Sequence, residues 1–492
     1  MATYEELRNV RMQKMQLLVD AGMAPYAGDV EHDYTLAELT KQFETLQTKD
    51  GEISIAGRIM SIRGQGAILF VTLFDGTDKF QVVFKKDEID EKLFSLFTDA
   101  VDIGDFIQVT GNLFITKAGQ NSLLVTSWKI LTKSLLALPD KWNGIQDVEE
   151  TQRKRYLDIL MDEETRNRFI VRSKIVTYIR NFFNTKDFLE IETPILQNQA
   201  GGAMARTFNT HHNDYDMPMV LRISLELEHK MLMVGGYPRV YEIGKNFRNE
   251  GTDPTHMQEF SMIEWYAAYE SLETNMLWTE QLLRGLATEV VGKNVFTVYD
   301  KEGNGIEVDF SREWPRVRFS DLLKQHADFD MNATLDDVRS KAIELGMDAT
   351  EAEKTGRGNL LDHIYKKTAR SKLVHPTFVL DYPADLKPLA QQNADGTARV
   401  AQLIIGGAEI TNQYAELVNP IVQRSLLEAQ AKAKDAGDEE AMQVDERFLT
   451  AMEYGMPPMT GFGMGIDRLV AIMTDQKNIR DTVFFPIMRP KQ

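Results

Sequence analysis

The sequence predicts a multidomain α+β protein, in which a small β-barrel precedes a larger domain that mixes helices and strands. The chain has 492 residues, which is enough for two or more domains. Short runs that alternate apolar and polar residues crowd between residues 53 and 131, and longer amphipathic stretches follow residue 150. A polar stretch with a proline and a glycine lies between them. We therefore divide the chain into residues 1–135, a linker at 136–150 and a domain over 151–492.

Composition and charge restrict the classes of protein that this chain can be. Hydrophobic residues make up 43% and charged residues 26%, as in ordinary globular proteins. Lys plus Arg is 56 and Asp plus Glu is 74, so the net charge of −18 argues against coating nucleic acid through bulk positive charge. A local RNA site is still compatible with that charge.

Cysteine usage and hydropathy indicate the compartment. The chain has no cysteine, which excludes disulfides, thiolate metal sites and thiol catalysis, and which is compatible with a reducing compartment. No apolar run reaches the roughly 18 residues of a membrane span. The N-terminal segment mixes acidic and basic residues at helical spacing, unlike a signal peptide. We expect a cytoplasmic protein with no membrane partner.

The first domain is expected to begin with two helices, at residues 3–24 and 34–47, and to continue as five short strands. Turn residues such as Asp75-Gly76 separate the strands. Five short strands in about 80 residues favour a small closed barrel, for which the OB-fold is a common solution. The alternative is another small β-domain without a ligand. The strands are expected at residues 53–61, 67–74, 80–84, 106–114 and 122–131.

The second domain is expected to begin with a long amphipathic helix that Asp162 caps. A strand pattern follows at residues 188–194, and Pro194 ends it. Residues 425–446 are polar with helical character, so we expect a solvated helix there.

The glycine run at residues 461–468 leaves a backbone almost free of side chains and leads into a helix near Ile466. The chain has no Gly-x-x-x-x-Gly-Lys-Ser/Thr phosphate loop. Pro457-Pro458 and the spacing of the glycines argue against a dinucleotide-binding fingerprint. A bare backbone with Arg468 at the start of a helix still permits close approach of a flat or anionic ligand.

A second constellation surrounds the polar turn at residues 251–254. Alternation on both sides of the turn predicts two antiparallel strands, which would bring Arg248 to one cleft with Phe260, Glu264 and Tyr266. The alternative is a surface hairpin with ordinary ion pairs. The histidines, including the pair His211-His212, lack metal-ligand spacing, and we interpret them as structural or solvated.

These segments resemble the three sequence motifs of class II aminoacyl-tRNA synthetases, and most closely those of the bacterial lysyl type. The first motif resembles residues 182–194, the second 247–260 and the third 461–468, and the resemblance extends over nearly the whole chain. It implies an OB-fold anticodon-binding domain and a class II catalytic domain built on an antiparallel β-sheet flanked by helices. It also implies an ATP-dependent lysine–tRNA ligase that forms lysyl-adenylate and transfers lysine to tRNA(Lys). A homodimer through the helix and strand of the first motif is implied as well.

The resemblance also implies roles for individual residues. Arg248 and Arg468 would be catalytic, because in-line attack of a carboxylate on a phosphate needs positioning and positive charge but no general base. The remaining roles are listed by ligand. ATP would contact Arg248, Glu250, His256, Phe260, Glu409, Gly465 and Arg468. Lysine would contact Gly202, Glu226, Arg248, Glu264, Tyr266, Asn412, Tyr414 and Glu416. Anticodon bases would contact Arg58, Arg63, Phe70 and Gln81. Mg²⁺ is the implied cofactor, with Glu409 as its carboxylate ligand.

Three positions depart from the family pattern. Gln402 stands where a magnesium-binding glutamate is usual, Thr255 replaces an arginine, and Ser127 stands about where a glutamate often helps to read the anticodon. These departures affect the metal count, the phosphate contacts and anticodon reading more than the overall function.

Three other functions compete with this interpretation. An aspartate or asparagine synthetase would need a cation where Glu416 stands, because a buried ammonium requires a carboxylate and a buried carboxylate requires a cation. Relatives that lysylate a protein typically lack the barrel. A non-catalytic RNA-binding module would not need both arginine motifs.

Overall fold

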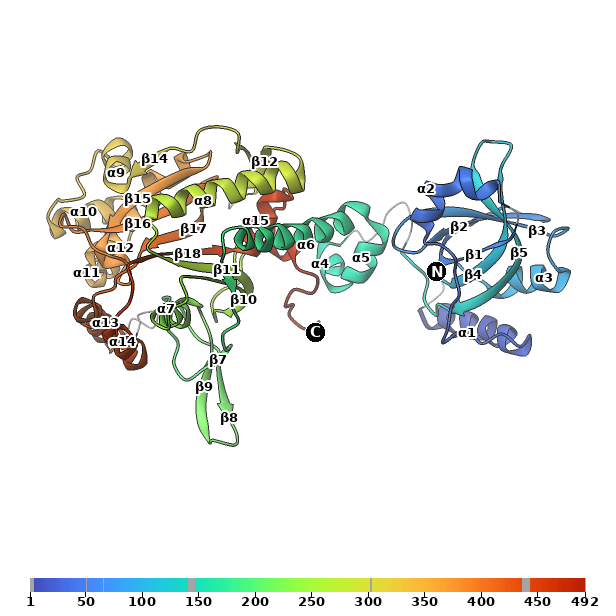
Figure 1. Ribbon diagram of the computed structural model, residues 1–492, viewed down its shortest axis with the longest axis horizontal. Coiled ribbons are helices and arrows are strands. Elements are labelled where there is room, and N and C mark those ends of the chain that lie inside the picture. Colours follow the sequence, from blue (N-terminus) through green and yellow to red (C-terminus); the bar gives the residue numbers. More distant parts are fainter. Residues whose placement is uncertain are drawn as a thin grey trace. The chain divides into compact units, whose positions relative to one another are not determined.

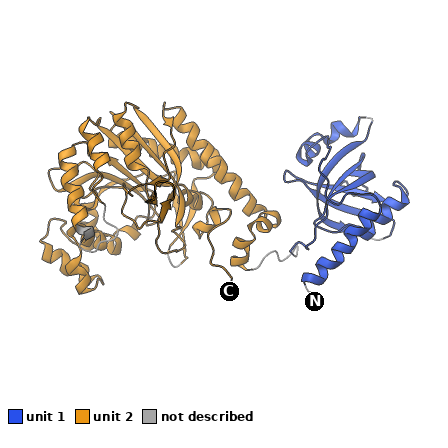
Figure 2. Cartoon of the chain, turned by 90° about the horizontal axis from the view of Figure 1, so that it is seen from below, with its two compact units in different colours: residues 1–146 blue, residues 147–492 orange. Residues whose placement is uncertain are grey.

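The computed structural model describes residues 4–49, 51–64, 66–139, 147–300, 303–435 and 443–491. The chain divides into two compact units, residues 1–146 and residues 147–492 (Figure 2). Part of the predicted linker, residues 140–146, lies outside the described residues. No helix in the described parts of the chain is long and apolar enough to cross a membrane.

Unit 1 is a closed five-stranded barrel with helices around it, as predicted (Figure 1). Its strands follow the order β1-β2-β3-β5-β4. The side chains that fill the barrel come from alternate positions, such as Leu69, Val71 and Leu73 on β2, because a strand turns successive side chains to opposite faces. The elements are α1 (Tyr4–Asp20), α2 (Leu36–Gln47), β1 (Ile53–Arg63), β2 (Ile68–Phe74), β3 (Lys79–Lys85), α3 (Glu91–Ala100), β4 (Phe106–Ile115) and β5 (Asn121–Thr132).

Unit 2 is built on a larger sheet. Its first part contains α4 (Val148–Arg153), α5 (Arg155–Met161), α6 (Glu163–Asn184), β6 (Leu189–Glu190), β7 (Leu196–Gln197), β8 (Asn209–His212), β9 (Met217–Leu221), α7 (Glu226–Val234), β10 (Arg239–Phe247), β11 (Glu259–Ala268), α8 (Leu272–Gly285) and the π-helical turn η1 (Leu286–Val291).

Its middle part contains β12 (Val295–Tyr299), β13 (Gly305–Asp309), β14 (Arg316–Arg318), α9 (Phe319–Ala327), α10 (Leu335–Glu344), α11 (Ala349–Lys354), α12 (Arg357–Thr368) and η2 (Arg370–Lys372). Its last part contains β15 (Thr377–Pro383), η3 (Ala384–Leu386), β16 (Thr397–Ile405), β17 (Ala408–Ala415), α13 (Pro420–Asp435), α14 (Glu446–Glu453), β18 (Met459–Gly465), α15 (Ile466–Met473) and η4 (Ile479–Thr482).

The main sheet of unit 2 has the strand order β14-β15-β16-β17-β18-β11-β10-β6 and is largely antiparallel. One face packs against α6, α8 and α15, which Figure 1 shows lying along the sheet. Ile263, Trp265, Phe462 and Met464 point to that helical layer. Alternate residues on the same strands therefore point to the opposite face, where the polar side chains gather.

The helix capped by Asp162 is confirmed, since its carboxylate accepts hydrogen bonds from the backbone of Glu164 and Thr165. The strand predicted at residues 188–194 is shorter than expected and covers only Leu189–Glu190. The reason is that the backbone N–H of Thr193 donates to the Glu242 carboxylate at 3.1 Å instead of continuing a strand ladder. The polar segment at 425–446 contains the C-terminal part of α13, and its residues 436–442 lie outside the described residues.

Candidate active site

The polar face of the sheet carries the predicted site residues in neighbouring rows. Glu264 on β11 pairs in register with Gly463 on β18, Gly463 with Asn412 on β17, and Asn412 with Gln402 on β16. Tyr266, Gly461 and Tyr414 form the next row. Because adjacent strands are about 4.8 Å apart, each row spans the width of a small ligand.

The alternating glycines of β18 explain the unusual third motif. Gly461, Gly463 and Gly465 all face the polar side, while Phe462 and Met464 between them are buried on the helical side. A Cβ at position 461 would collide with the Glu416 carboxylate and the Tyr266 ring. The glycine run is thus a strand rather than a loop, and it forms a floor without side chains.

A cavity of about 240 Å³ lies over this floor. Seven of the eight residues predicted to bind lysine line it: Gly202, Glu226, Arg248, Glu264, Tyr266, Asn412 and Tyr414. Gly202 adopts φ +79°, and a Cβ there would lie 2.9 Å from both the Glu226 Cβ and the Ser224 Oγ. A glycine is therefore required for the chain to enter the cavity wall at this point.

The eighth residue, Glu416, lies behind the wall in a buried cluster of charge. The Nζ atom of Lys230 is 2.6 Å from Glu226 Oε1 and 2.6 Å from Glu416 Oε2. The side chains of Lys230 and Glu416 have no exposed surface. Sequence reasoning missed Lys230, although its place four residues after Glu226 on α7 is the spacing of a helical ion pair.

Glu264 completes the cluster as its third carboxylate. It accepts hydrogen bonds from the Ser224 hydroxyl and the Leu225 N–H at 3.2 Å each, and from the Tyr266 hydroxyl at 3.2 Å. Burial raises the pKa of Glu264, and it raises the pKa of Glu416 to about 8 although Lys230 opposes that change. Burial alone would lower the pKa of Lys230, but Glu226 and Glu416 outweigh it and raise that pKa. Because burial raises the pKa of Glu264 and of Glu416, a further cation that enters the site favours the ionised form of these two carboxylates.

The two predicted catalytic arginines lie at the other end of the site. Arg248 follows β10 directly, and its guanidinium lies over the Phe260 ring at 5.2 Å from the ring centroid. Arg468, in the first turn of α15, donates to the backbone oxygens of Glu409 at 2.6 Å and Thr255 at 3.3 Å. Its Nη2 atom is also 3.4 Å from His256 Nε2.

The remaining residues predicted to bind ATP take less direct positions. Gly465 ends β18 and precedes α15 directly. Glu250 lies in the turn after β10, where its N–H donates to the carbonyl oxygen of Arg248 at 2.9 Å. The structure therefore brings Arg468 together with Glu409 and His256, and it brings Arg248, which lines the cavity, together with Phe260.

The expected metal position contains one carboxylate and two amides. The Gln402 amide donates to Asn412 Oδ1 at 2.7 Å, and Asn412 Nδ2 donates to Glu409 Oε1. No group of three or more His, Cys, Asp or Glu that could hold a metal occurs among the described residues. Mg²⁺ is usually bound by one or two carboxylates together with phosphates and waters. The donor set fits an ion that ATP brings and Glu409 contacts, and it does not fit a second ion held by protein carboxylates.

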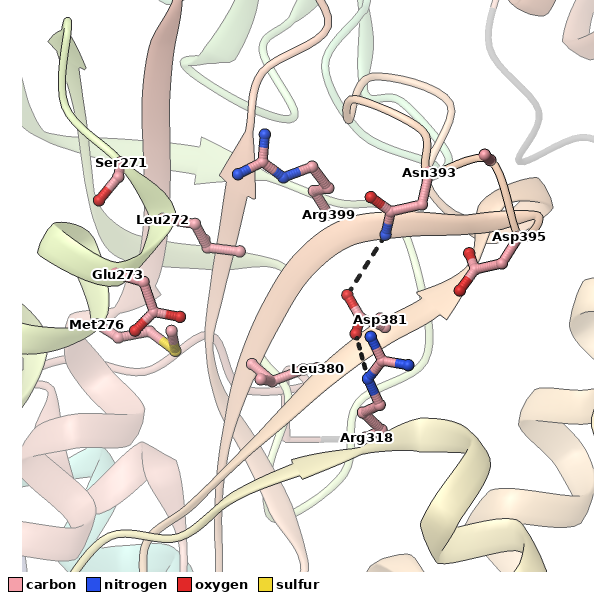
Figure 3. A pocket seen from close by; sticks show the side chains of 11 residues that line it. Ser271, Leu272, Glu273, Met276, Arg318, Leu380, Asp381, Asn393, Asp395 and Arg399 are labelled. Atoms are coloured by element: carbon pink, nitrogen blue, oxygen red, sulfur yellow. Dashed lines mark hydrogen bonds and ion pairs between the residues drawn. The ribbon is translucent and has the colours of Figure 1, made fainter.

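A second, larger hollow of about 540 Å³ lies beside the N-terminus of α8 (Figure 3). It contains none of the predicted site residues. Asp381 accepts a hydrogen bond from Asn393 at 3.5 Å and forms an ion pair with Arg318 at 3.1 Å. Because these groups satisfy each other, the smaller cavity on the sheet remains the candidate site.

The residues predicted to contact the anticodon lie on the outer face of the barrel in unit 1. Phe70 is half-buried and lies outside the barrel core, while its neighbours Leu69 and Val71 are inside it. Arg63 pairs in register with Phe70. Gln81 donates to Ser122 Oγ at 2.8 Å. The Arg58 guanidinium lies 4.4 Å from the centroid of Phe106. An outward aromatic ring beside polar groups is the arrangement that stacks single-stranded bases.

Known proteins agree with this architecture. Residues 147–489 match the family described as tRNA synthetases class II (D, K and N), and residues 53–131 match the OB-fold nucleic acid binding domain. The chain belongs to the class II tRNA synthetases.

Within that family its similarity is to lysine–tRNA ligases. It is 40% identical to the lysine–tRNA ligase of Moorella thermoacetica and 42% identical to that of Carboxydothermus hydrogenoformans, with 99% of this chain and 98% of the relative covered in each case. It is 41% identical to that of Nostoc punctiforme, with 99% of this chain and 88% of the relative covered.

Proposed function

We propose that this chain is a lysine–tRNA ligase that activates L-lysine with ATP and transfers it to tRNA(Lys). The observation that carries the proposal is the buried cluster in which Lys230 pairs with Glu226 and Glu416 while Glu264, which lines the same cavity as Glu226, binds Ser224, Leu225 and Tyr266 instead of a cation. When all three carboxylates are ionised they exceed the one lysine ammonium by two negative charges, and L-lysine carries two ammonium groups. Arg248 lines the same cavity and supplies the positive charge for the lysine carboxylate.

Each substrate group then has a partner in the cavity. Glu226 and Glu264 face the α-ammonium, and Glu416, which lies behind the wall beside Tyr266, provides the negative charge for the ε-ammonium. Asn412 and Tyr414 close the wall. A buried charge favours a ligand group of opposite charge, because an unpaired ion in this environment is strongly disfavoured.

The chemistry needs orientation and positive charge rather than a base, since the lysine carboxylate is already ionised. Phe260 stacks on adenine, Glu250 lies near its edge, and His256 faces the far phosphates. Arg248 and Arg468 stabilise the charge of the α-phosphate while the carboxylate attacks and diphosphate leaves. Mg²⁺, when bound with ATP and contacted by Glu409, neutralises phosphate charge.

The barrel recognises the anticodon of tRNA(Lys) through Phe70, Gln81, Arg58 and Arg63. Residues 1–134 contain 14 Lys and Arg against 19 Asp and Glu, so local charge and stacking must provide the recognition. We place the protein in the cytoplasm, in keeping with the absence of cysteine.

A homodimer through α6 and β6 is part of the proposal. Strand β6 is the last strand of the sheet, and both Leu189 on it and Ile170 on α6 are exposed. An exposed edge with apolar side chains is favourable for pairing with a second copy. Sedimentation equilibrium at twice the chain mass of 56.1 kDa would support this, and a monomer would contradict it.

The function is tested by amino-acid-dependent exchange of diphosphate with ATP, using each amino acid in turn. We expect exchange with lysine, and charging of tRNA(Lys) in a second assay. Exchange with aspartate or asparagine instead would identify a sister synthetase. Lysine exchange without charging of any tRNA would favour an enzyme that lysylates a protein.

A further inference from the structure

Lys387 is a charged residue of the site with no role assigned so far. It follows η3, lines the cavity and is half-buried. Its Nζ atom donates to Asn412 Oδ1 at 3.1 Å and lies 5.7 Å from the Tyr414 ring centroid and 5.5 Å from that of Tyr382. No carboxylate of the described residues lies at ion-pair distance from it. An ammonium inside a cavity without a carboxylate partner is unfavourable unless an anion joins it.

The surroundings of Lys387 indicate where that anion binds. Asn412 Oδ1 accepts from both Lys387 and Gln402, and Asn412 Nδ2 donates to Glu409. Asn412 thus connects Lys387 to Glu409, the one carboxylate among the described residues at the expected metal position. Burial lowers the pKa of Lys387, and carboxylates that include Glu409 and Glu226 oppose that shift. Because Lys387 lines the same cavity as Glu226 and shares Asn412 with Glu409, its ammonium lies between the proposed lysine site and Glu409.

The same geometry is unfavourable for a second protein-bound metal ion. Gln402 brings no charge, and its amide N–H₂ is already used by Asn412. A divalent ion beside Gln402 would have one carboxylate near it, Glu409, and an ammonium that repels it.

We propose that Lys387 is a resident cation of the activation site. Its ammonium contacts the substrate anions that meet beside Glu409, namely the ATP phosphates and the lysine carboxylate, and replaces the charge of a metal ion held by protein carboxylates. This inference rests on the proposed function, because that function supplies these anions. Lys387 and Gln402 act together. If position 402 were a glutamate, it and Glu409 would require another Mg²⁺ to balance their charge. With the neutral amide of Gln402, the ammonium of Lys387 is sufficient.

The test compares Lys387→Met, which removes the charge, with Lys387→Arg, which keeps it. The free Mg²⁺ needed for half-maximal lysine-dependent exchange at fixed ATP should rise on the order of tenfold in Lys387→Met, as for loss of a charge-assisted contact. It should change little in Lys387→Arg. Lys324→Met, which alters a lysine with a 68% exposed side chain on α9, is the matched control and should titrate like the parent. Lys387→Gln keeps a hydrogen-bond donor and serves if methionine prevents folding.

A second readout counts metal ions without turnover. Mn²⁺ bound per chain in the presence of a non-hydrolysable ATP analogue is measured by electron paramagnetic resonance. The double variant Lys387→Met with Gln402→Glu should bind one more Mn²⁺ per chain than the parent.

The proposal is overturned if Lys387→Met shows the parental Mg²⁺ requirement, or if the double variant binds the parental number of ions. A parent that fails to exchange with lysine refutes the proposed function instead. The Mn²⁺ count still decides the role of Lys387 in that case, because it requires only the ATP analogue.

Discussion

Replacing Glu416 with glutamine tests the origin of lysine recognition. The substitution keeps the shape of the side chain and one acceptor oxygen, but it removes the charge that faces Lys230 at 2.6 Å and, in the proposed complex, the ε-ammonium of the substrate. Removing one partner of a buried ion pair costs about 3–5 kcal/mol. Since Lys230 keeps Glu226 as a partner at 2.6 Å, we expect the lower end of that range.

A loss of about 3 kcal/mol corresponds to roughly a hundredfold rise in the KM for lysine in the exchange assay. The KM for ATP should stay within about threefold, because Glu416 pairs with Lys230 behind the cavity wall, whereas Arg468 contacts Glu409, Thr255 and His256. Glu228→Gln is the matched control on α7, since that carboxylate pairs with the exposed Arg447 instead. Thermal unfolding of both variants checks that they are folded.

A lysine KM that is unchanged in folded Glu416→Gln would refute this reasoning. It would mean that the ε-ammonium does not use Glu416, and the preference for lysine over aspartate would lose its main support.

Three further predictions concern the barrel, the metal position and the protonation of Glu416. Phe70→Ala should weaken charging of tRNA through loss of a stacking contact of roughly 1–3 kcal/mol while exchange without tRNA is retained; an equal collapse of both activities would make Phe70 a structural residue. Glu409→Gln should raise the Mg²⁺ needed for half-maximal exchange strongly, and Gln402→Glu should lower it; a Glu409→Gln titration like that of the parent would remove the metal assignment. Lysine affinity should fall as the pH drops from 8 to 6. The pKa of Glu416 is raised to about 8, so its carboxyl group becomes protonated in the free site over this range, whereas lysine binds the ionised carboxylate. Calorimetry at pH 7 in two buffers of different ionisation enthalpy should then show proton release on binding, which Glu416→Gln should reduce.

Local sequence patterns predicted the elements whose signals are local. The barrel strands followed from alternation, and the helix after Asp162 from its cap. The strand at residues 188–194 was predicted too long because the pattern could not reveal that the Thr193 backbone binds Glu242 across the chain. Local propensity cannot include a partner 49 residues away.

The site was predicted mainly by resemblance, which identified Arg248 and Arg468 but missed the two lysines Lys230 and Lys387. Lys230 lies at a recognisable helical spacing from Glu226, but nothing local shows that this face of α7 points inward. Lys387 lies in an irregular segment between η3 and Pro388, where there is no periodicity to use. Its contact with Asn412 depends on the tertiary fold, which brings together residues 25 positions apart.

The affinity of the purified protein for L-lysine and for norleucine, compared by calorimetry, tests the central claim most directly. Norleucine has the four side-chain carbons and the α-groups of lysine but no ε-ammonium. If the two surplus charges of the Glu226, Glu264 and Glu416 cluster recognise two ammonium groups, norleucine should bind at least about a thousandfold more weakly, as for a ligand that leaves buried polar groups unpaired. Similar affinities for the two would contradict the account.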